Sequence, residues 1–249
     1  MRFTKFNRYI CFVFIVMQTQ FIVAQDPIDT CNDNTYINSD DPNTIEYDNM
    51  VGLYHSTIIK EVNGTIKVWG ERAANNGSSD VLSPIEVNSA NGYNYQGYIL
   101  KIAGGGNRGS NTQFLILTTE GLYAWGSEGR VIHENLTNGT AFGKVNPTAS
   151  ANVPGTNAYS LPMGVNPMDV KMMFGSYYTL AIVTHSGEAW ILSKDEKFGD
   201  GSSGSSGNIQ EVWHRIHKSP TETLDNVVAM RGNRKGMMAL TLDGKVYTW

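Results

Sequence analysis

One glycine-rich segment has the spacing of a dinucleotide-binding loop. The residues Gly104-Gly-Gly106-Asn-Arg-Gly109 match G-x-G-x-x-G and follow a strand-like run. In a dinucleotide site the last glycine opens a helix, whose N-terminus receives the pyrophosphate. Here the following residues, Phe114-Leu-Ile-Leu-Thr-Thr119, are typical of a strand and lead to a turn at Glu120-Gly121. We therefore expect a β repeat and no bound cofactor.

Three histidines could act as a base or bind a metal. His55 has no partner at a defined spacing, which a general base requires, so we expect a structural role within its own segment. His214 and His217 are three residues apart, which would place both on one face of a helix. Their surroundings favour a strand, in which they face opposite sides, so we expect a surface pair and no metal.

Several carboxylates invite a calcium or a hydrolase hypothesis. Four of the six aspartates in the polar segment 26–49 suggest a calcium site, but the segment has no glycine and distal glutamate at EF-hand spacing, and Cys31 occupies an alternating position. These four aspartates are Asp29, Asp33, Asp40 and Asp41. We expect a solvated segment there. Asp200, Glu128 and Glu134 lie between strand-like runs and could serve glycoside hydrolysis, because its carboxylates can come from distant loops.

The first 25 residues are typical of a secretory signal peptide. Arg2, Lys5 and Arg8 precede a short apolar run, and Ala24 offers a small residue near a cleavage site. Gln18 interrupts the run, which is too short for a membrane span. Cleavage takes the basic count from 19 to 16 against 23 acidic residues, a net charge of −7. We expect a secreted or cell-surface protein that has no membrane span after cleavage and binds no nucleic acid.

Residues 50–249 contain four copies of one pattern. In each copy a first glycine precedes a turn glycine by twelve residues, and the turn glycines are separated by 57, 66 and 57 residues. These pairs are Gly52 and Gly64, Gly109 and Gly121, Gly175 and Gly187, and Gly232 and Gly244. An aromatic position follows each turn, occupied by Trp69, Trp125 and Trp249; in the third copy Leu192 takes this place and Trp190 stands two residues earlier. Such self-similarity predicts a propeller or solenoid.

Each copy supplies a hairpin and further apolar runs. An apolar run, a glycine turn and a returning run that includes the aromatic position predict two paired strands. Runs such as 99–103 before the hairpin and 84–87 after it add an incoming strand and a fourth strand. We therefore expect an all-β propeller of four-stranded blades at residues 50–97, 98–168, 169–225 and 226–249.

The motifs resemble the repeat of the RCC1 (regulator of chromosome condensation) family. Gly52-x-x-His55-Ser56, Asn63-Gly64, Val68-Trp69-Gly70 and Ser83-Pro84 are similar to that repeat, and so is Leu240-Thr-Leu-Asp-Gly-Lys-Val-Tyr-Thr-Trp249. The resemblance implies a seven-bladed β-propeller in which His55 is structural. Thr112, Tyr178 and Lys235 replace that histidine in the other copies. Only about three and a half blades are present, so we expect an incomplete propeller.

The favoured function is a secreted, non-enzymatic module that binds a protein or cell-surface ligand through propeller loops. The segments 130–167 and 197–208 are the expected binding loops, because rigid repeats can present long loops on one face. A secreted enzyme acting on polysaccharide through loop carboxylates is the alternative. Nucleotide exchange on a small GTPase, implied by the resemblance, is a remote one, since the export signal and the acidic charge oppose it.

Overall fold

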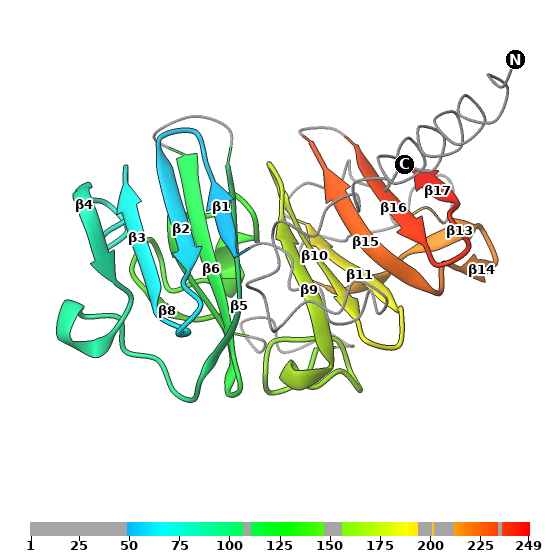
Figure 1. Cartoon of the computed structure of the whole chain (residues 1–249), viewed down its shortest axis with the longest axis horizontal. Helices are drawn as coiled ribbons and strands as arrows, with labels where there is room; N and C mark the ends of the chain where they lie inside the picture. The colour runs from blue at the N-terminus through cyan, green and yellow to red at the C-terminus, as the bar shows by residue number, and fades with distance from the viewer. Residues whose placement is uncertain (1–48, 107–110, 147–155, 194–200, 202–211, 234–235) are drawn as a thin grey trace, which may run out of the picture.

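The fold was analysed in a computed structural model, which describes residues 49–106, 111–146, 156–193, 201, 212–233 and 236–249. The described part is all-β, with three four-stranded antiparallel sheets and one three-stranded sheet that stand side by side (Figure 1). Each of these sheets corresponds to one sequence copy and is called a blade. The prediction of propeller blades is therefore confirmed, whereas the predicted signal peptide and the segment 26–48 lie outside the described residues.

In every blade the strands are ordered as in the chain. Blade 1 comprises β1 (Met50–Gly52), β2 (Ser56–Lys60), β3 (Ile66–Gly70) and β4 (Val81–Glu86). Blade 2 comprises β5 (Ile99–Gly106), β6 (Thr112–Thr118), β7 (Gly121–Gly126) and β8 (Gly143–Lys144). Blade 3 comprises β9 (Val170–Gly175), β10 (Thr179–Thr184), β11 (Ala189–Ser193) and β12 (His214–Arg215). Blade 4 comprises β15 (Val227–Gly232), β16 (Met237–Thr241) and β17 (Val246–Thr248).

The predicted hairpins form the middle of each blade. The turn glycines adopt positive φ values, 85° at Gly64, 82° at Gly187 and 78° at Gly244, a region that costs glycine little and other residues more. Blade 2 differs, because Thr118 pairs directly with Gly121 and leaves a turn of two residues. The two strands therefore pair locally in all four copies, through a glycine turn in three of them and through Thr119 and Glu120 in blade 2, where Gly121 already belongs to β7.

The strand register shows where the first glycine of each copy lies. Gly52 pairs with Thr57, Gly175 with Leu180 and Gly232 with Met237, always at the end of the innermost strand. In blade 2 the glycine that pairs with the corresponding residue, Phe114, is Gly104. Gly109 lies outside the described residues, and β5 continues past Gly104 to Gly106. The glycine twelve residues before Gly121 is thus Gly109, which is not the glycine that pairs with Phe114. The two differ in the second copy because the connection between β5 and β6 is longer.

The core consists of layers between neighbouring blades. Successive residues of a strand face opposite sides of its sheet, so each blade packs one face against each neighbour. Phe114 and Ile116 of β6 pack with blade 1, whereas Leu115 and Leu117 pack with blade 3. A third layer, which includes Ala181 and Val183 of β10 with Met237 and Ala239 of β16, joins blades 3 and 4. The blades therefore form a rigid scaffold for their connecting loops.

The segment 130–167 differs from the expected surface loop. It contributes a 3-10 turn, η3 (Glu134–Leu136), and the short strand β8. Its apolar side chains are buried in the layer between blades 2 and 3, namely Val131, Ile132, Leu136, Val145, Leu161 and Val165. Two backbone N–H groups of this segment, at Val131 and Ile132, donate to the buried side-chain oxygen of Gln113 at 2.7 and 3.0 Å. Much of the segment is therefore core, which the sequence pattern did not reveal.

Two further turns precede the innermost strands, η1 (Ser89–Asn91) and η4 (Pro167–Asp169). A small hairpin follows blade 3 in the chain and precedes blade 4. It consists of β13 (His217–Ser219) and β14 (Glu222–Thr223), and it was not predicted. It follows β12 directly, and the backbone N–H of Leu224 donates to the carbonyl of Ile216 at 2.8 Å. This hairpin brings a polar connection beside blade 4.

Candidate binding pocket on the fourth blade

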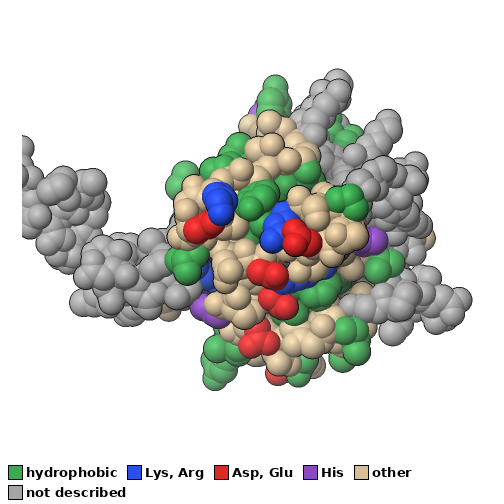
Figure 2. Space-filling model, turned by 90° about the vertical axis from the view of Figure 1, so that its right-hand side faces the viewer, with side chains coloured by type: hydrophobic (Ala, Val, Ile, Leu, Met, Phe, Trp, Pro, Cys, Tyr) green, Lys and Arg blue, Asp and Glu red, His purple; other side chains and the backbone are tan. Residues whose placement is uncertain are grey.

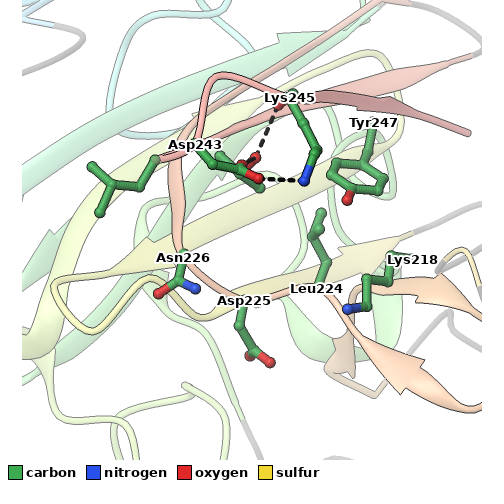
Figure 3. Close-up of a pocket in the computed structure, with 9 residues that line it drawn as sticks. Lys218, Leu224, Asp225, Asn226, Asp243, Lys245 and Tyr247 are labelled. Atoms are coloured by element: carbon green, nitrogen blue, oxygen red, sulfur yellow. Dashed lines mark hydrogen bonds and ion pairs between the residues drawn. The ribbon is translucent and has the colours of Figure 1, made fainter.

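A pocket lies between the β16–β17 turn and the connection that leads into β15 (Figure 3). It has a volume of about 500 Å³. Its lining residues are Lys218, Leu224, Asp225, Asn226, Thr241, Leu242, Asp243, Lys245 and Tyr247. Figure 3 shows Asp225 and Asn226 opposite the Asp243–Lys245 pair, with Tyr247 and Lys218 along one side. The pocket is thus surrounded by polar groups from two separate stretches of the chain.

The turn side of the pocket holds a fixed ion pair. Lys245 Nζ lies 2.6 Å from Asp243 Oδ2, and the Thr241 hydroxyl donates to Asp243 Oδ1 at 2.5 Å. These hydrogen bonds, from Lys245 first and then Thr241, lower the pKa of Asp243 to about 2. The same pair raises the pKa of Lys245. Both side chains are therefore charged at neutral pH, and their orientation is set by the turn.

The opposite side is held by an arginine. Arg215 pairs with Asp225 and also lies 3.6 Å from a Glu188 carboxylate oxygen. Its guanidinium stands over the Trp190 ring, 5.4 Å from the ring centroid. The Thr223 hydroxyl adds a hydrogen bond of 3.1 Å to Asp225. Arg215 and Thr223 therefore hold the Asp225 carboxylate in place. The contacts of Arg215 agree with the preference of arginine for planar carboxylates and aromatic faces.

Asn226 is held by backbone contacts with two turns. Its φ of 57° lies in the left-handed region, which asparagine tolerates better than most residues. The N–H of Leu242 donates to the Asn226 carbonyl at 2.8 Å, and the N–H of Val227 donates to the Gly187 carbonyl at 3.0 Å. The turns of blades 3 and 4 therefore position this residue at the edge of the pocket.

The fourth-blade end of the molecule carries mixed charge. Figure 2 shows Lys or Arg side chains next to Asp or Glu side chains near its middle, with hydrophobic side chains among and around them. The third pair at the pocket joins Lys218 to Glu222, with 3.5 Å between the nitrogen and the oxygen. Each charged side chain that lines the pocket therefore has an opposite charge beside it.

The geometry suits binding better than acid–base chemistry. A general acid needs a proton near neutral pH, which enzymes achieve by raising a carboxyl pKa. Asp243 shows the opposite shift, and Asp225 is paired with Arg215. In the described part of the chain, no three His, Cys, Asp or Glu side chains are grouped so that they could hold a metal ion.

The chain matches no protein-family model and no curated protein by sequence. Solved structures match in fold. Human WBSCR16 matches with a TM-score of 0.54 and 14% identity, over 80% of this chain and 47% of that protein. Prp20p from Saccharomyces cerevisiae matches with a TM-score of 0.52 and 16% identity, over 80% of this chain and 42% of that protein. Yeast RCC1 (Prp20) bound to Kap60 gives a TM-score of 0.49 and 17% identity, over 80% and 40% of the two chains. The chain has an RCC1-like repeat fold.

The RCC1-like chain spans less than half the length of these proteins. Its three complete blades and one three-stranded blade agree with the prediction of about three and a half blades. In the described ranges no helix is long and apolar enough to cross a membrane.

In the RCC1-like blades, the aromatic positions occupy the third strand. Trp69 pairs with Thr57 and Trp125 with Phe114, whereas Leu192 takes this register in blade 3. Trp249 exchanges backbone hydrogen bonds with Met237 in blade 4. Trp125 is buried, stacks on Phe114 with 5.0 Å between ring centroids, and donates from Nε1 to the Ala73 carbonyl at 3.0 Å. Trp190 pairs with Ile182 and lies beneath Arg215.

His55 bonds within its own RCC1-like blade. Its Nδ1 lies 2.9 Å from Glu71 Oε2, and its side chain is 57% exposed. The hydroxyl of the next residue, Ser56, donates to the Glu71 carbonyl at 2.7 Å. The two contacts tie the start of β2 to the residue after β3.

The other candidate residues do not converge on one site. His214 and His217 lie on β12 and β13, which belong to different sheets. Gly104 to Gly106 form the end of β5, and the next described strand is β6, so the described residues on both sides of this segment belong to one β-sheet. Glu128 and Glu134 lie on the connection between β7 and β8, at the blade end opposite the hairpin turns. Asp200, most of 197–208 and the aspartates of 26–48 are outside the described residues.

Sequence reasoning missed most of the pocket. It identified the Asp243-Gly244 turn, but Lys218 and Asn226 gave no motif. They reach Tyr247 only through the packing of the β13–β14 hairpin and of the 224–226 connection beside blade 4. The one local signal for the pocket was the position of Asn226, directly before the apolar run that forms β15.

Proposed function

We propose that this chain is a non-enzymatic binding module, exported from the cell, that captures a protein or cell-surface ligand at the loops of its fourth blade. The observation that carries the proposal is the pocket itself. Six of its nine lining residues lie in turns or connections, while the blades behind it are held by continuous apolar layers. A rigid scaffold that presents loops binds without losing much conformational freedom.

The charges of the pocket support binding without turnover. Its carboxylates are engaged by Lys245, Thr241 and Arg215. A hydrolase would need one of them to hold a proton. The hypothesis of a polysaccharide-acting enzyme therefore gains no support from this site.

The fold also fits an interaction role. Yeast Prp20p binds Gsp1p and histones. We do not extend those partners to this chain, because residues 1–25 are typical of an export signal and the remaining chain carries a net charge of −7. A ligand outside the cell agrees better with both features.

The test has two arms. The gene is expressed in a secreting host, and the N-terminus of the exported protein is determined by mass spectrometry. The purified protein is then incubated with isolated cell envelopes and extracellular protein fractions, and its retention is measured. We expect a product that begins near residue 26 and is retained by one of these fractions.

Two results would contradict the proposal. The first is a protein that stays inside the cell with residues 1–25 attached. The second is glycan turnover that Asp225→Asn or Asp243→Asn abolishes, which would establish an enzyme.

A further inference from the structure

We propose that the fourth-blade pocket binds an uncharged sugar unit of a glycan. The inference deepens the proposed function and rests on it, because it assigns the ligand class of the same site. A volume of about 500 Å³ lies within the range of about 300–1,000 Å³ that is common for small-ligand sites.

The first argument is charge compensation. The pocket contains Lys245 paired with Asp243, Lys218 paired with Glu222, and Asp225 paired with Arg215. An anionic ligand would meet two carboxylates, and a cationic ligand would meet two ammonium groups. A neutral ligand avoids both repulsions and leaves the three ion pairs intact.

The second argument is the supply of hydrogen-bonding groups. Ionised carboxylates keep free acceptor positions and ammonium groups keep free donors after one pairing. The Asn226 amide and the Tyr247 hydroxyl line the same pocket, and neither makes a side-chain hydrogen bond with the residues described here. Sugar hydroxyls both donate and accept, so they can use this mixture of groups.

The third argument is the apolar surface beside these groups. Leu242 lines the pocket and is 68% exposed, and Tyr247 packs partly buried against the layer between blades 3 and 4. Figure 3 shows Tyr247 on the same side of the pocket as Lys218. The carbon-bound hydrogens of a sugar ring need such a surface, and an aromatic side chain provides it with little loss of rotamer freedom.

The binding experiment uses the full chain and a set of neutral trisaccharides, namely cellotriose, maltotriose, mannotriose and N-acetylchitotriose. Affinity is measured by isothermal titration calorimetry at low and at high salt. We expect at least one trisaccharide to bind with an affinity that salt leaves unchanged, because a neutral ligand makes no ion pair that salt could screen.

Variants locate the site. Asn226→Ala and Tyr247→Phe each remove hydrogen-bonding groups, and each should weaken binding about fivefold. Tyr247→Ala also removes the ring and should weaken binding further. The control is Glu61→Gln, which breaks a similar exposed pair with Lys67 on blade 1, 2.6 Å long, and should leave binding unchanged. Circular dichroism verifies that each variant is folded.

The outcomes separate the two proposals. If the envelopes retain the protein but no neutral trisaccharide binds or competes, the sugar proposal is wrong and the binding module stands. Salt-sensitive binding of polygalacturonate in place of a neutral sugar would also overturn it. Equal binding by wild type, Asn226→Ala and Tyr247→Ala would show that the pocket is not the site. Turnover of a bound trisaccharide would contradict only the non-enzymatic function.

Discussion

At the residue scale, Asp243 illustrates how a short turn sets a charge. The Asp-Gly turn brings Lys245 and Thr241 to the same carboxylate, and their hydrogen bonds lower its pKa to about 2. The carboxylate of an unfolded chain titrates near pH 3.9, so the folded state binds this proton more weakly. The stabilisation is therefore present above about pH 4 and is lost as the pH falls through about 2.

Asp243→Asn tests this linkage. The variant lacks the titrating group, so the difference in unfolding free energy between wild type and variant should be constant above about pH 4 and should shrink towards about pH 2. Urea unfolding at several pH values measures it. A difference that does not depend on pH would contradict the assignment.

Tyr93 is a residue-scale link between blades 1 and 2. Its side chain is fully buried, and its hydroxyl donates to the Ala73 carbonyl at 2.6 Å. Burial raises the pKa of the phenol. Trp125 donates to the same carbonyl oxygen, so that oxygen keeps one partner when the hydroxyl is removed.

We therefore expect Tyr93→Phe to lower the free energy of unfolding by about 1 kcal/mol, the typical contribution of one hydrogen bond. The loss should not be larger, because no buried acceptor is left without a partner. Urea unfolding monitored by tryptophan fluorescence provides the measurement. An unchanged midpoint would show that the hydroxyl bond contributes nothing.

At the element scale, the innermost strands approach one another at their glycines. A Cβ added to Gly175 at the end of β9 would lie 2.7 Å from the carbonyl carbon of Gly104 in β5 and would also meet the carbonyl oxygen. Gly52 holds the same register position in blade 1, where a Cβ would have nothing within 4 Å. One position in the repeat thus has two different surroundings.

Gly175→Ala should lower the free energy of unfolding by about 2 kcal/mol, because backbone cannot yield as a side chain can. Gly52→Ala is the matched control and should be nearly neutral. Thermal unfolding of both variants, measured by circular dichroism, compares them directly. Equal midpoints would mean that β5 and β9 are not in close contact.

At the scale of the whole molecule, blade 4 has one covered face and one open face. Met238 occupies the register position of Ile58, Leu115 and Ala181, which are buried between blades. Met238 itself is 50% exposed, and Val246, which pairs with Leu240 on the same sheet, is 61% exposed. The open face therefore has the apolar character of an inter-blade layer, and exposed apolar faces of this kind favour association.

We expect the chain to self-associate at high concentration and Met238→Lys to reduce that association without unfolding the protein. Sedimentation velocity over a range of concentrations measures it. Leu82→Lys serves as the control, since Leu82 is 96% exposed on β4 of blade 1. Equal association of the two variants would exclude the open face of blade 4 as its cause.

The sequence by itself determined the repeated hairpins. Glycine turns, apolar runs and the Trp69, Trp125 and Trp249 positions are local features, because turn geometry and strand alternation depend on neighbouring residues. The all-β blades followed from their repetition at fixed offsets. The first glycine of blade 2 could not be found in this way, since the longer connection moved Gly104 out of the twelve-residue offset.

Only the tertiary structure decided which distant residues share a site. Lys218 and Asn226 meet Tyr247 because the β13–β14 hairpin and the 224–226 connection pack beside blade 4. The burial of segment 130–167 was decided in the same way, by the space between blades 2 and 3. Such contacts depend on how whole sheets pack against one another, and the apolar periodicity of a single segment does not predict that packing.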